Sequence, residues 1–314
     1  MLKRICTWHF DEFEEAMAGI RGRHVLVERA RSLWQLDVLA LGDVALMDGR
    51  NGARSVYQGA CDAETCIVFV PIESRRGLSL NGRDLEGGGL GIAPSGRENR
   101  VPSDSGLRWL TVSIRPHAFP HLWDGGKPLL SPDVAFRAGA VDPRAQERLA
   151  SLVLDAFRVA IDAPGTFEDP TTRRVLQDQL VDAAEGAVSA LGAPVDDHGG
   201  RPRIDRARVL DAALQLIRDN ADAPLRISDL CAQTGVSAAT LRATFDEQLR
   251  LSPHRYLMLY RMHAIRRALL HARAGETIAS VCGRFGVWEF GRFATQYRRQ
   301  FGVTPVQTLR SGRG

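Results

Sequence analysis

Residues 286–305 read GVWEFGRFATQYRRQFGVTP, with aromatic side chains four residues apart at Phe293, Tyr297 and Phe301. In an α-helix this spacing places the three rings on one face. The residues around that apolar stripe are mostly basic or amide side chains, and the stretch contains a single acid, Glu289. The pattern predicts a helix that buries its aromatic face and presents a basic, amide-rich face to another molecule.

The same plan occurs twice in the last third of the chain. When residues 226–257 are laid over residues 277–309, Gly235 aligns with Gly286 and, after one inserted residue, Phe245 aligns with Tyr297. A helix, a turn around glycine and a second helix is the helix-turn-helix plan, and glycine supplies the positive φ that such a turn requires. One copy alone would more often be an ordinary helical hairpin. Two copies in register favour a DNA-binding domain.

The charge distribution supports this interpretation. Residues 201–314 contain 19 Arg, no Lys and 9 acidic residues, a net charge of +10, whereas residues 1–200 carry −6. Such a division indicates an anionic partner for the C-terminal third only. A major groove of DNA admits one helix, so we expect the polar faces of the two second helices to contact double-stranded DNA.

The predicted DNA-contacting residues differ between the two units. In the first unit the predicted contacts include a single long side chain, that of Arg242. The full set is Ser237, Ala238, Ala239, Thr240, Arg242 and Ala243. The second unit offers Trp288, Glu289, Gly291, Arg292, Thr295, Gln296, Arg298 and Arg299. Arg292 can donate to guanine or phosphate, Gln296 can pair with adenine, and Glu289 can accept from cytosine. Gly291 allows a close approach of the backbone. We expect the first unit to read shape and thymine methyl groups, and Arg298 and Arg299 to bind phosphate.

Residues 253–273 join the two units as one predicted helix. A helix of about 20 residues spans roughly 30 Å. This is close to the ~34 Å between successive major-groove faces on one side of DNA. A single chain can therefore read two adjacent turns.

The first 192 residues have a different character. Residues 33–47 alternate apolar with polar or small side chains, and glycine-rich segments at 48–52 and 86–96 are typical of turns, which together predict a sandwich or small barrel. Residues 142–161 and 171–191 are predicted amphipathic helices, the first with Asp142 as N-cap before Pro143. The predicted domains are a β-rich sensor at 1–140, a helical dimerisation element at 141–192, a linker at 193–203 and a double helix-turn-helix at 204–314.

Composition excludes several classes of protein. The chain is 44% hydrophobic and 25% charged, and it lacks any run of about 18 apolar residues that would span a membrane. The N-terminus turns acidic where a signal peptide needs an apolar core, so we expect the protein to stay in the cytoplasm. Five scattered cysteines match neither a zinc motif nor a CxxC redox pair and indicate reduced, mostly buried thiols.

Residues 206–310 resemble the DNA-binding domain of AraC/XylS-type bacterial transcription regulators. The resemblance is carried by ISDLCAQTGVSAATLRATF, by SPHRYLMLYRMHAIRRALL and above all by IASVCGRFGVWEFGRFATQYRRQFGVTP. The pattern GxWxxGRFAxxYRxxFGxxPxxTL is similar to one branch of the family, with Val287 and Met262 as small departures. The resemblance implies an α+β protein: a cupin-like β-roll followed by two dimerisation helices, and an all-α domain with two helix-turn-helix units joined by a long helix. It also implies a homodimeric activator that contacts RNA polymerase and is controlled by a small-molecule effector.

Three hypotheses remain for residues 1–192. In the first, this part binds the effector, with candidate pocket residues Trp34, Arg97, Arg100, Arg108 and Trp109, whose arginines suggest an anionic ligand. In the second it is a metal-dependent cupin-like enzyme. The histidines His9, His24, His117 and His121 are too dispersed for a metal site, and familiar catalytic motifs are absent, so we expect no metal, cofactor or catalytic residue. In the third it binds a protein.

Overall fold

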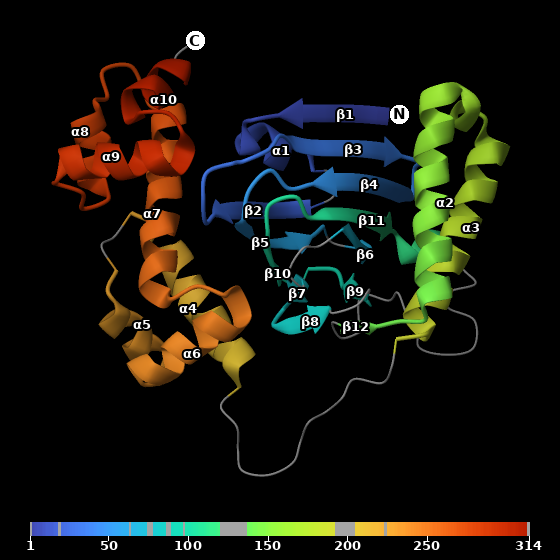
Figure 1. Cartoon of the computed structure of the whole chain (residues 1–314), viewed down its shortest axis with the longest axis horizontal. Coiled ribbons are helices and arrows are strands. Elements are labelled where there is room, and N and C mark those ends of the chain that lie inside the picture. Colours follow the sequence, from blue (N-terminus) through green and yellow to red (C-terminus); the bar gives the residue numbers. More distant parts are fainter. Residues whose placement is uncertain are drawn as a thin grey trace. The chain divides into compact units, whose positions relative to one another are not determined.

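The computed structural model describes residues 2–312 except 18–19, 63, 74–77, 86–88, 97, 120–136, 192–204 and 223–224. Strands occupy most of the first part of the chain and helices the rest, which confirms the predicted α+β class (Figure 1). The predicted linker, 193–203, lies outside the described residues. Among the described residues, no helix is long and apolar enough to cross a membrane.

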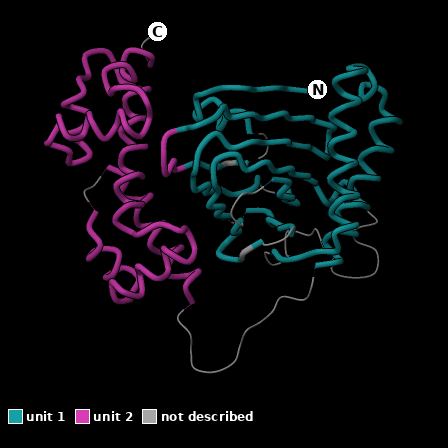
Figure 2. The backbone as a smooth tube through the Cα atoms, in the orientation of Figure 1, with its two compact units in different colours: residues 1–24, 30–198 teal, residues 25–29, 199–314 magenta. Residues whose placement is uncertain are grey.

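The chain forms two compact units (Figure 2). The first comprises residues 1–24 and 30–198, and the second comprises residues 25–29 and 199–314. The exact residues at which the predicted domains begin and end remain predictions.

The first unit is built around an antiparallel sheet of seven described strands in the order β1-β3-β4-β11-β6-β9-β12. Their bounds are β1 Leu2–Thr7, β3 Trp34–Ala40, β4 Val44–Arg50, β11 Arg108–Ile114, β6 Cys66–Glu73, β9 Gly89–Ala93 and β12 Arg137–Ala140. The predicted alternation is confirmed in β3, where Trp34, Leu36 and Val38 are buried and Gln35 is exposed. Side chains therefore divide between two faces of the sheet.

A smaller sheet, β10-β5-β2, supplies the other wall of the first unit. Its strands are β10 Glu98–Ser103, β5 Ser55–Cys61 and β2 Ile20–Leu26, and a short helix, α1, covers Phe10–Ala16. A separate hairpin joins β7, Leu78–Leu80, to β8, Arg83–Leu85. Its turn residues Asn81 and Gly82 both have positive φ, 52° and 78°, as a two-residue hairpin turn requires. Side chains from both sheets line one internal cavity.

Two long helices pack on the outer face of the seven-stranded sheet: α2, Pro143–Asp162, and α3, Pro170–Ser189 (Figure 1). The predicted cap of α2 is confirmed, since the Asp142 side chain accepts from the backbone N–H of Arg144 at 3.1 Å. The apolar faces of these helices join the sheet in a single core, to which Leu149, Phe157 and Leu180 contribute. Most of the apolar surface that was predicted to form a dimer interface is therefore already buried within the unit.

The second unit is helical in its described residues. Its helices are α4 Arg206–Asp219, α5 Ile227–Thr234, α6 Ala238–Leu249, α7 Pro253–Leu270, α8 Ile278–Arg284, α9 Phe290–Phe301 and α10 Pro305–Ser311. The pairs α5–α6 and α8–α9 are the two predicted helix-turn-helix units, and α7 joins them. Gly235 and Gly286 both have a φ of 68°, which confirms why glycine stands at the two turns.

Candidate nucleic-acid interface

The first predicted DNA-contacting face lies at the start of α6 and has short side chains. Ser237 caps the helix, because its Oγ accepts from the backbone N–H of Thr240 at 3.2 Å. The two hydroxyls also lie 3.0 Å apart, so both are engaged in the cap. The remaining members of the set are exposed: Ala238, Ala239, Arg242 and Ala243. Arg242 is therefore the one long side chain that this face can extend toward DNA.

The second face lies on α9 and in the turn before it, and it is richer in charge. Phe293 and Tyr297 are buried, as predicted, and the Tyr297 hydroxyl donates to Thr308 Oγ1 of α10 at 2.9 Å. This contact fixes the rotation of α9 about its axis. The predicted set is then exposed in full: Trp288, Glu289, Gly291, Arg292, Thr295, Gln296, Arg298 and Arg299.

The charged side chains of this face make only weak contacts with the rest of the protein. Arg292 Nη1 lies 3.4 Å from Glu289 Oε2, and both side chains are about three-quarters exposed, at 73% and 74%. Such an exposed pair contributes about 0–1 kcal/mol, so Arg292 can leave it for a partner at little cost. The side chains of three further arginines have no hydrogen-bond or ion-pair partner among the described residues: Arg242, Arg298 and Arg299.

The helix that joins the two helix-turn-helix units has about the predicted length. Helix α7 contains 18 residues, which at 1.5 Å per residue is about 27 Å. Tyr256 and Leu259 are buried on its packed side, and Tyr256 meets Phe245 of α6 with ring centroids 5.7 Å apart. At its other end, Ile265 and Leu269 belong to the core that also contains Phe293 of α9. The two recognition helices are thus both packed against one connecting helix.

The predicted effector residues lie in different places: Trp34 and Trp109 both lie beside Phe13, and Trp109 lines a cavity between the two sheets, but the described arginines do not join them there. Trp34 is fully buried and packs on Phe13 at a centroid distance of 4.9 Å, and Trp109 donates from Nε1 to Asn51 Oδ1 at 3.0 Å. Arg100 is buried on β10, and Arg97 lies outside the described residues. Arg108 precedes Trp109 on β11 and therefore points to the opposite face of the sheet.

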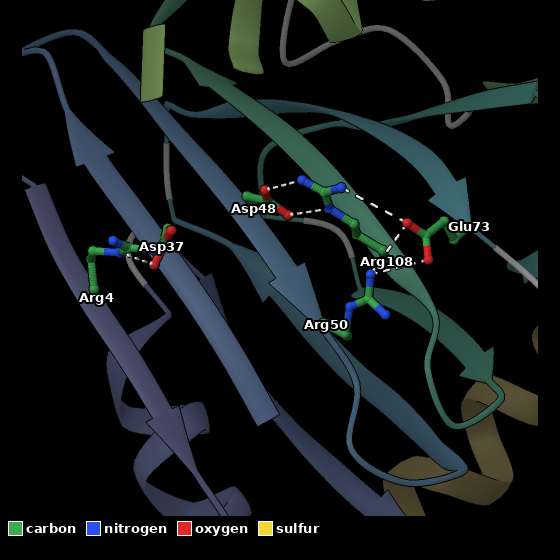
Figure 3. A network of polar contacts seen from close by, with 6 residues as sticks. All are labelled: Arg4, Asp37, Asp48, Arg50, Glu73 and Arg108. Atoms are coloured by element: carbon green, nitrogen blue, oxygen red, sulfur yellow. Dashed lines mark hydrogen bonds and ion pairs between the residues drawn. The ribbon is translucent and has the colours of Figure 1, made fainter. Parts of the chain in front are cut away.

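On that outer face Arg108 takes part in a charged network (Figure 3). Its Nη2 lies 2.7 Å from Asp48 Oδ2. Asp48 faces Asp37 on the neighbouring strand, and Arg4 Nε lies 3.1 Å from Asp37 Oδ1. Each acid of this facing pair thus has its own arginine. Because the Asp48 carboxylate accepts hydrogen bonds from Arg108, the pKa of that guanidinium is raised above its usual value. The Arg108 guanidinium is therefore engaged in this network of ion pairs.

A cavity of about 70 Å³ lies between the two sheets. Its lining is mostly apolar, and none of the lining residues is acidic or a Lys or Arg. Two hydroxyls that line it, Tyr57 Oη and Thr111 Oγ1, are buried without a hydrogen-bond partner among the described residues. Burial also raises the pKa of the Tyr57 hydroxyl, so it stays protonated. Sequence patterns do not identify these polar groups, because alternation along a strand shows which residues share a face of the sheet and not which residues they meet across the fold.

Within the described residues, no three His, Cys, Asp or Glu side chains converge as a metal site would require. The thiols of Cys61 and Cys66 are buried, and burial raises their pKa to about 12 and about 11. Both therefore remain protonated, unreactive thiols at neutral pH.

The helical unit is similar to parts of known proteins. A family model described as a helix-turn-helix domain matches residues 230–311. A probable thc operon regulatory protein of Rhodococcus erythropolis is 33% identical over 104 residues, which are 33% of this chain and 31% of that protein. The HTH-type transcriptional activator RhaR of Pectobacterium carotovorum subsp. carotovorum (strain PC1) is 27% identical over 169 residues, 53% of this chain and 58% of RhaR. The chain thus spans less than two thirds of either relative.

The crystal structure of the AraC-like transcriptional activator CuxR matches 91% of this chain and 100% of CuxR, with 16% identity and a TM-score of 0.43. The assignment itself rests on the sequence matches, since they fall on the segment that carries both helix-turn-helix units and the exposed faces described above. Residues 230–311 of the helical unit therefore match a helix-turn-helix domain and are similar to parts of proteins that are named as transcription regulators.

Proposed function

We propose that the protein is a sequence-specific DNA-binding transcription activator controlled by a small molecule that binds its first unit. The observation that carries the proposal is the pair of helix-turn-helix units packed on one connecting helix, each with its predicted DNA-contacting face exposed. The relatives matched by the helical unit are regulators by name. These names support regulation of transcription as the function.

DNA binding is tested on the full chain. Genomic fragments that the protein retains are sequenced to obtain the operator, and affinity for operator and random duplexes is then measured between 50 and 200 mM salt. With about six phosphate contacts, affinity should fall on the order of 10³-fold over this range. A double variant, Arg242→Ala with Arg292→Ala, should lose preference for the operator, whereas Arg310→Ala, an exposed arginine of α10, should keep it. Absence of binding at low salt would refute the proposal.

The effector site that we propose is the cavity between the two sheets. A cavity of about 70 Å³ is under half of the ~150 Å³ that admits benzene, so the ligand is small or the cavity expands around it. The lack of an acidic, Lys or Arg residue in the lining favours an uncharged, mostly apolar molecule. One oxygen or nitrogen of that molecule would bond to Tyr57 or Thr111, whose hydroxyls would otherwise stay unpaired. This replaces the anionic ligand suggested by the arginines.

A thermal-shift screen of the full chain tests the effector site, with small alcohols, ketones and aromatics in one arm and carboxylates in the other. We expect stabilisation by uncharged compounds, lost in Tyr57→Phe or Thr111→Val. A series of metal ions in the same screen tests the enzyme hypothesis, which predicts that a metal stabilises the chain. If the first unit instead binds a regulatory protein, no small molecule should raise the melting temperature.

The dimer and the contact with RNA polymerase are also part of the proposal. The apolar faces of α2 and α3 are buried in the core of the first unit, and three large apolar side chains remain exposed on these helices: Val159, Ile161 and Val175, the last at 52%. A symmetric pairing of these helices would cover them.

In-vitro transcription with purified polymerase tests activation, and protein that binds the operator without raising transcript levels would contradict it.

A further inference from the structure

A groove of about 610 Å³ runs along α7 in the helical unit. One wall is the face of α7 that carries His254, Met258 and Arg261, and the other is the turn before α9 together with the start of that helix. These α7 positions follow the three- and four-residue spacing of a single helical face. This face looks away from the packed side of α7, which holds Tyr256 and Leu259.

Arg261 gives the groove its charge. Its guanidinium is half-buried and has no hydrogen-bond or ion-pair partner among the described residues. Burial lowers the pKa of this group, although the guanidinium stays charged. Helix α7 contains no acidic residue that could compensate it. A partly desolvated cation without a partner is costly in a protein unless an anion completes the site.

The walls beside Arg261 are apolar and exposed. Trp288 is 73% exposed, the highest value among the exposed large hydrophobic side chains of the described residues, and Met258 is 37% exposed. A groove lined by a half-buried cation and by two exposed apolar side chains matches a chain of alternating phosphates and sugars better than it matches a neutral peptide. Arg226, at the α5 end of the groove, adds a second cation.

The groove is continuous with the DNA-contacting face of α9. Arg292 and Gln296, two of the residues predicted to read bases, also line it. Glu289 is the one acid in the lining, and Arg292 already pairs with it. A ligand that occupies the groove therefore extends directly from the DNA bound by α9.

We propose that this groove holds the sugar-phosphate backbone of the operator between the two major-groove segments that α6 and α9 enter. Arg261 pairs with one phosphate, and Trp288 and Met258 pack on the neighbouring deoxyriboses. The inference rests on the proposed function, because it assigns a further part of the same DNA-binding surface. It makes α7 a DNA-contacting element as well as a spacer.

The test compares Arg261→Gln, Arg261→Lys and the control Arg310→Gln in the full chain. Removing one phosphate contact lowers the slope of log affinity against log salt by about 0.9. The advantage of the wild type over Arg261→Gln should therefore shrink about 3.5-fold between 50 and 200 mM salt. It should do so equally on operator and random DNA, since phosphate carries no sequence information. Arg261→Lys keeps the charge and should keep most of the slope, and Arg310→Gln should keep all of it.

Phosphate ethylation interference locates the contact. One phosphate between the two major-groove segments should interfere with binding by the wild type and not with binding by Arg261→Gln. If Arg261→Gln folds poorly, Trp288→Ala serves in its place, because this side chain is largely exposed, and it should weaken binding to both duplexes alike. A wild type that binds no DNA overturns the proposed function. A wild type that binds, with the salt slope and ethylation pattern unchanged in Arg261→Gln, overturns only this inference.

Discussion

Gly291 lies in the first turn of α9, on the face that carries Arg292 and Thr295, and a Cβ built on it meets no atom within 4 Å. The change Gly291→Ala therefore adds a methyl group in open space. Because alanine loses less conformational freedom than glycine in a helix, the variant should be more stable by about 0.5–1 kcal/mol. For a unit of about a hundred residues this corresponds to a rise of about 2–6 °C in the melting temperature.

The same methyl group should weaken DNA binding. If α9 lies in the major groove, glycine at this position marks the closest approach of its backbone to the bases. A methyl there displaces the helix and breaks the neighbouring contact of Arg292, and a bidentate base contact is worth about 1–3 kcal/mol. The expected loss of operator affinity is therefore about 5- to 150-fold.

Calorimetry and fluorescence anisotropy on an operator duplex measure the two effects. Gly186→Ala is the matched control, since Gly186 lies in α3 of the first unit and its Cβ would also meet nothing within 4 Å. It should give a similar gain in the stability of its own unit and leave DNA affinity unchanged. If Gly291→Ala binds the operator as tightly as the wild type, this face of α9 does not approach DNA and the assignment of the second unit fails.

Gly235→Ala should destabilise the helical unit by about 1–2 kcal/mol, because its Cβ has room but its φ of 68° does not suit alanine; an unchanged or higher melting temperature would contradict this. Arg292→Ala should cost about 1–3 kcal/mol and relax specificity at one base pair, as measured on a library of operator variants, and equal losses on operator and random DNA would exclude a base contact. Arg298→Ala should instead weaken binding alike on all sequences and lower the salt slope by about one. Val175→Asp should turn the proposed dimer into a monomer in sedimentation at micromolar concentration; a persistent dimer would place the interface elsewhere.

The helical unit was predictable because its signals are local. Four-residue spacing identified Phe293 and Tyr297 as the buried side of α9, and that choice alone decides which residues face outward. The glycines at 235 and 286 stand where the backbone turns with positive φ, a constraint that few other residues satisfy. The groove along α7 was not predicted, since it forms between elements that lie about thirty residues apart in the sequence.

The first unit was predictable only in outline, because strand pairing joins distant segments. Alternation in β11 separates Arg108 from Trp109 correctly, but it cannot show that Asp48 of β4 lies beside Arg108. A candidate pocket assembled from residue type therefore mixed side chains from the two faces of one sheet. In the same way, the apolar faces of α2 and α3 were expected to pair between chains, and much of that surface covers the chain's own sheet.

The two recognition faces differ in how much sequence information they can carry. The face of α6 ends in three alanines and one arginine, whereas that of α9 presents arginines, an amide and a carboxylate. Alanines accept many base pairs at similar free energy, while each bidentate contact excludes most alternatives. An alignment of operators should therefore be asymmetric: the half that faces α9 should have a well-defined base sequence, and the half that faces α6 should be degenerate. That asymmetry gives each site a direction on the chromosome, which a symmetric motif lacks.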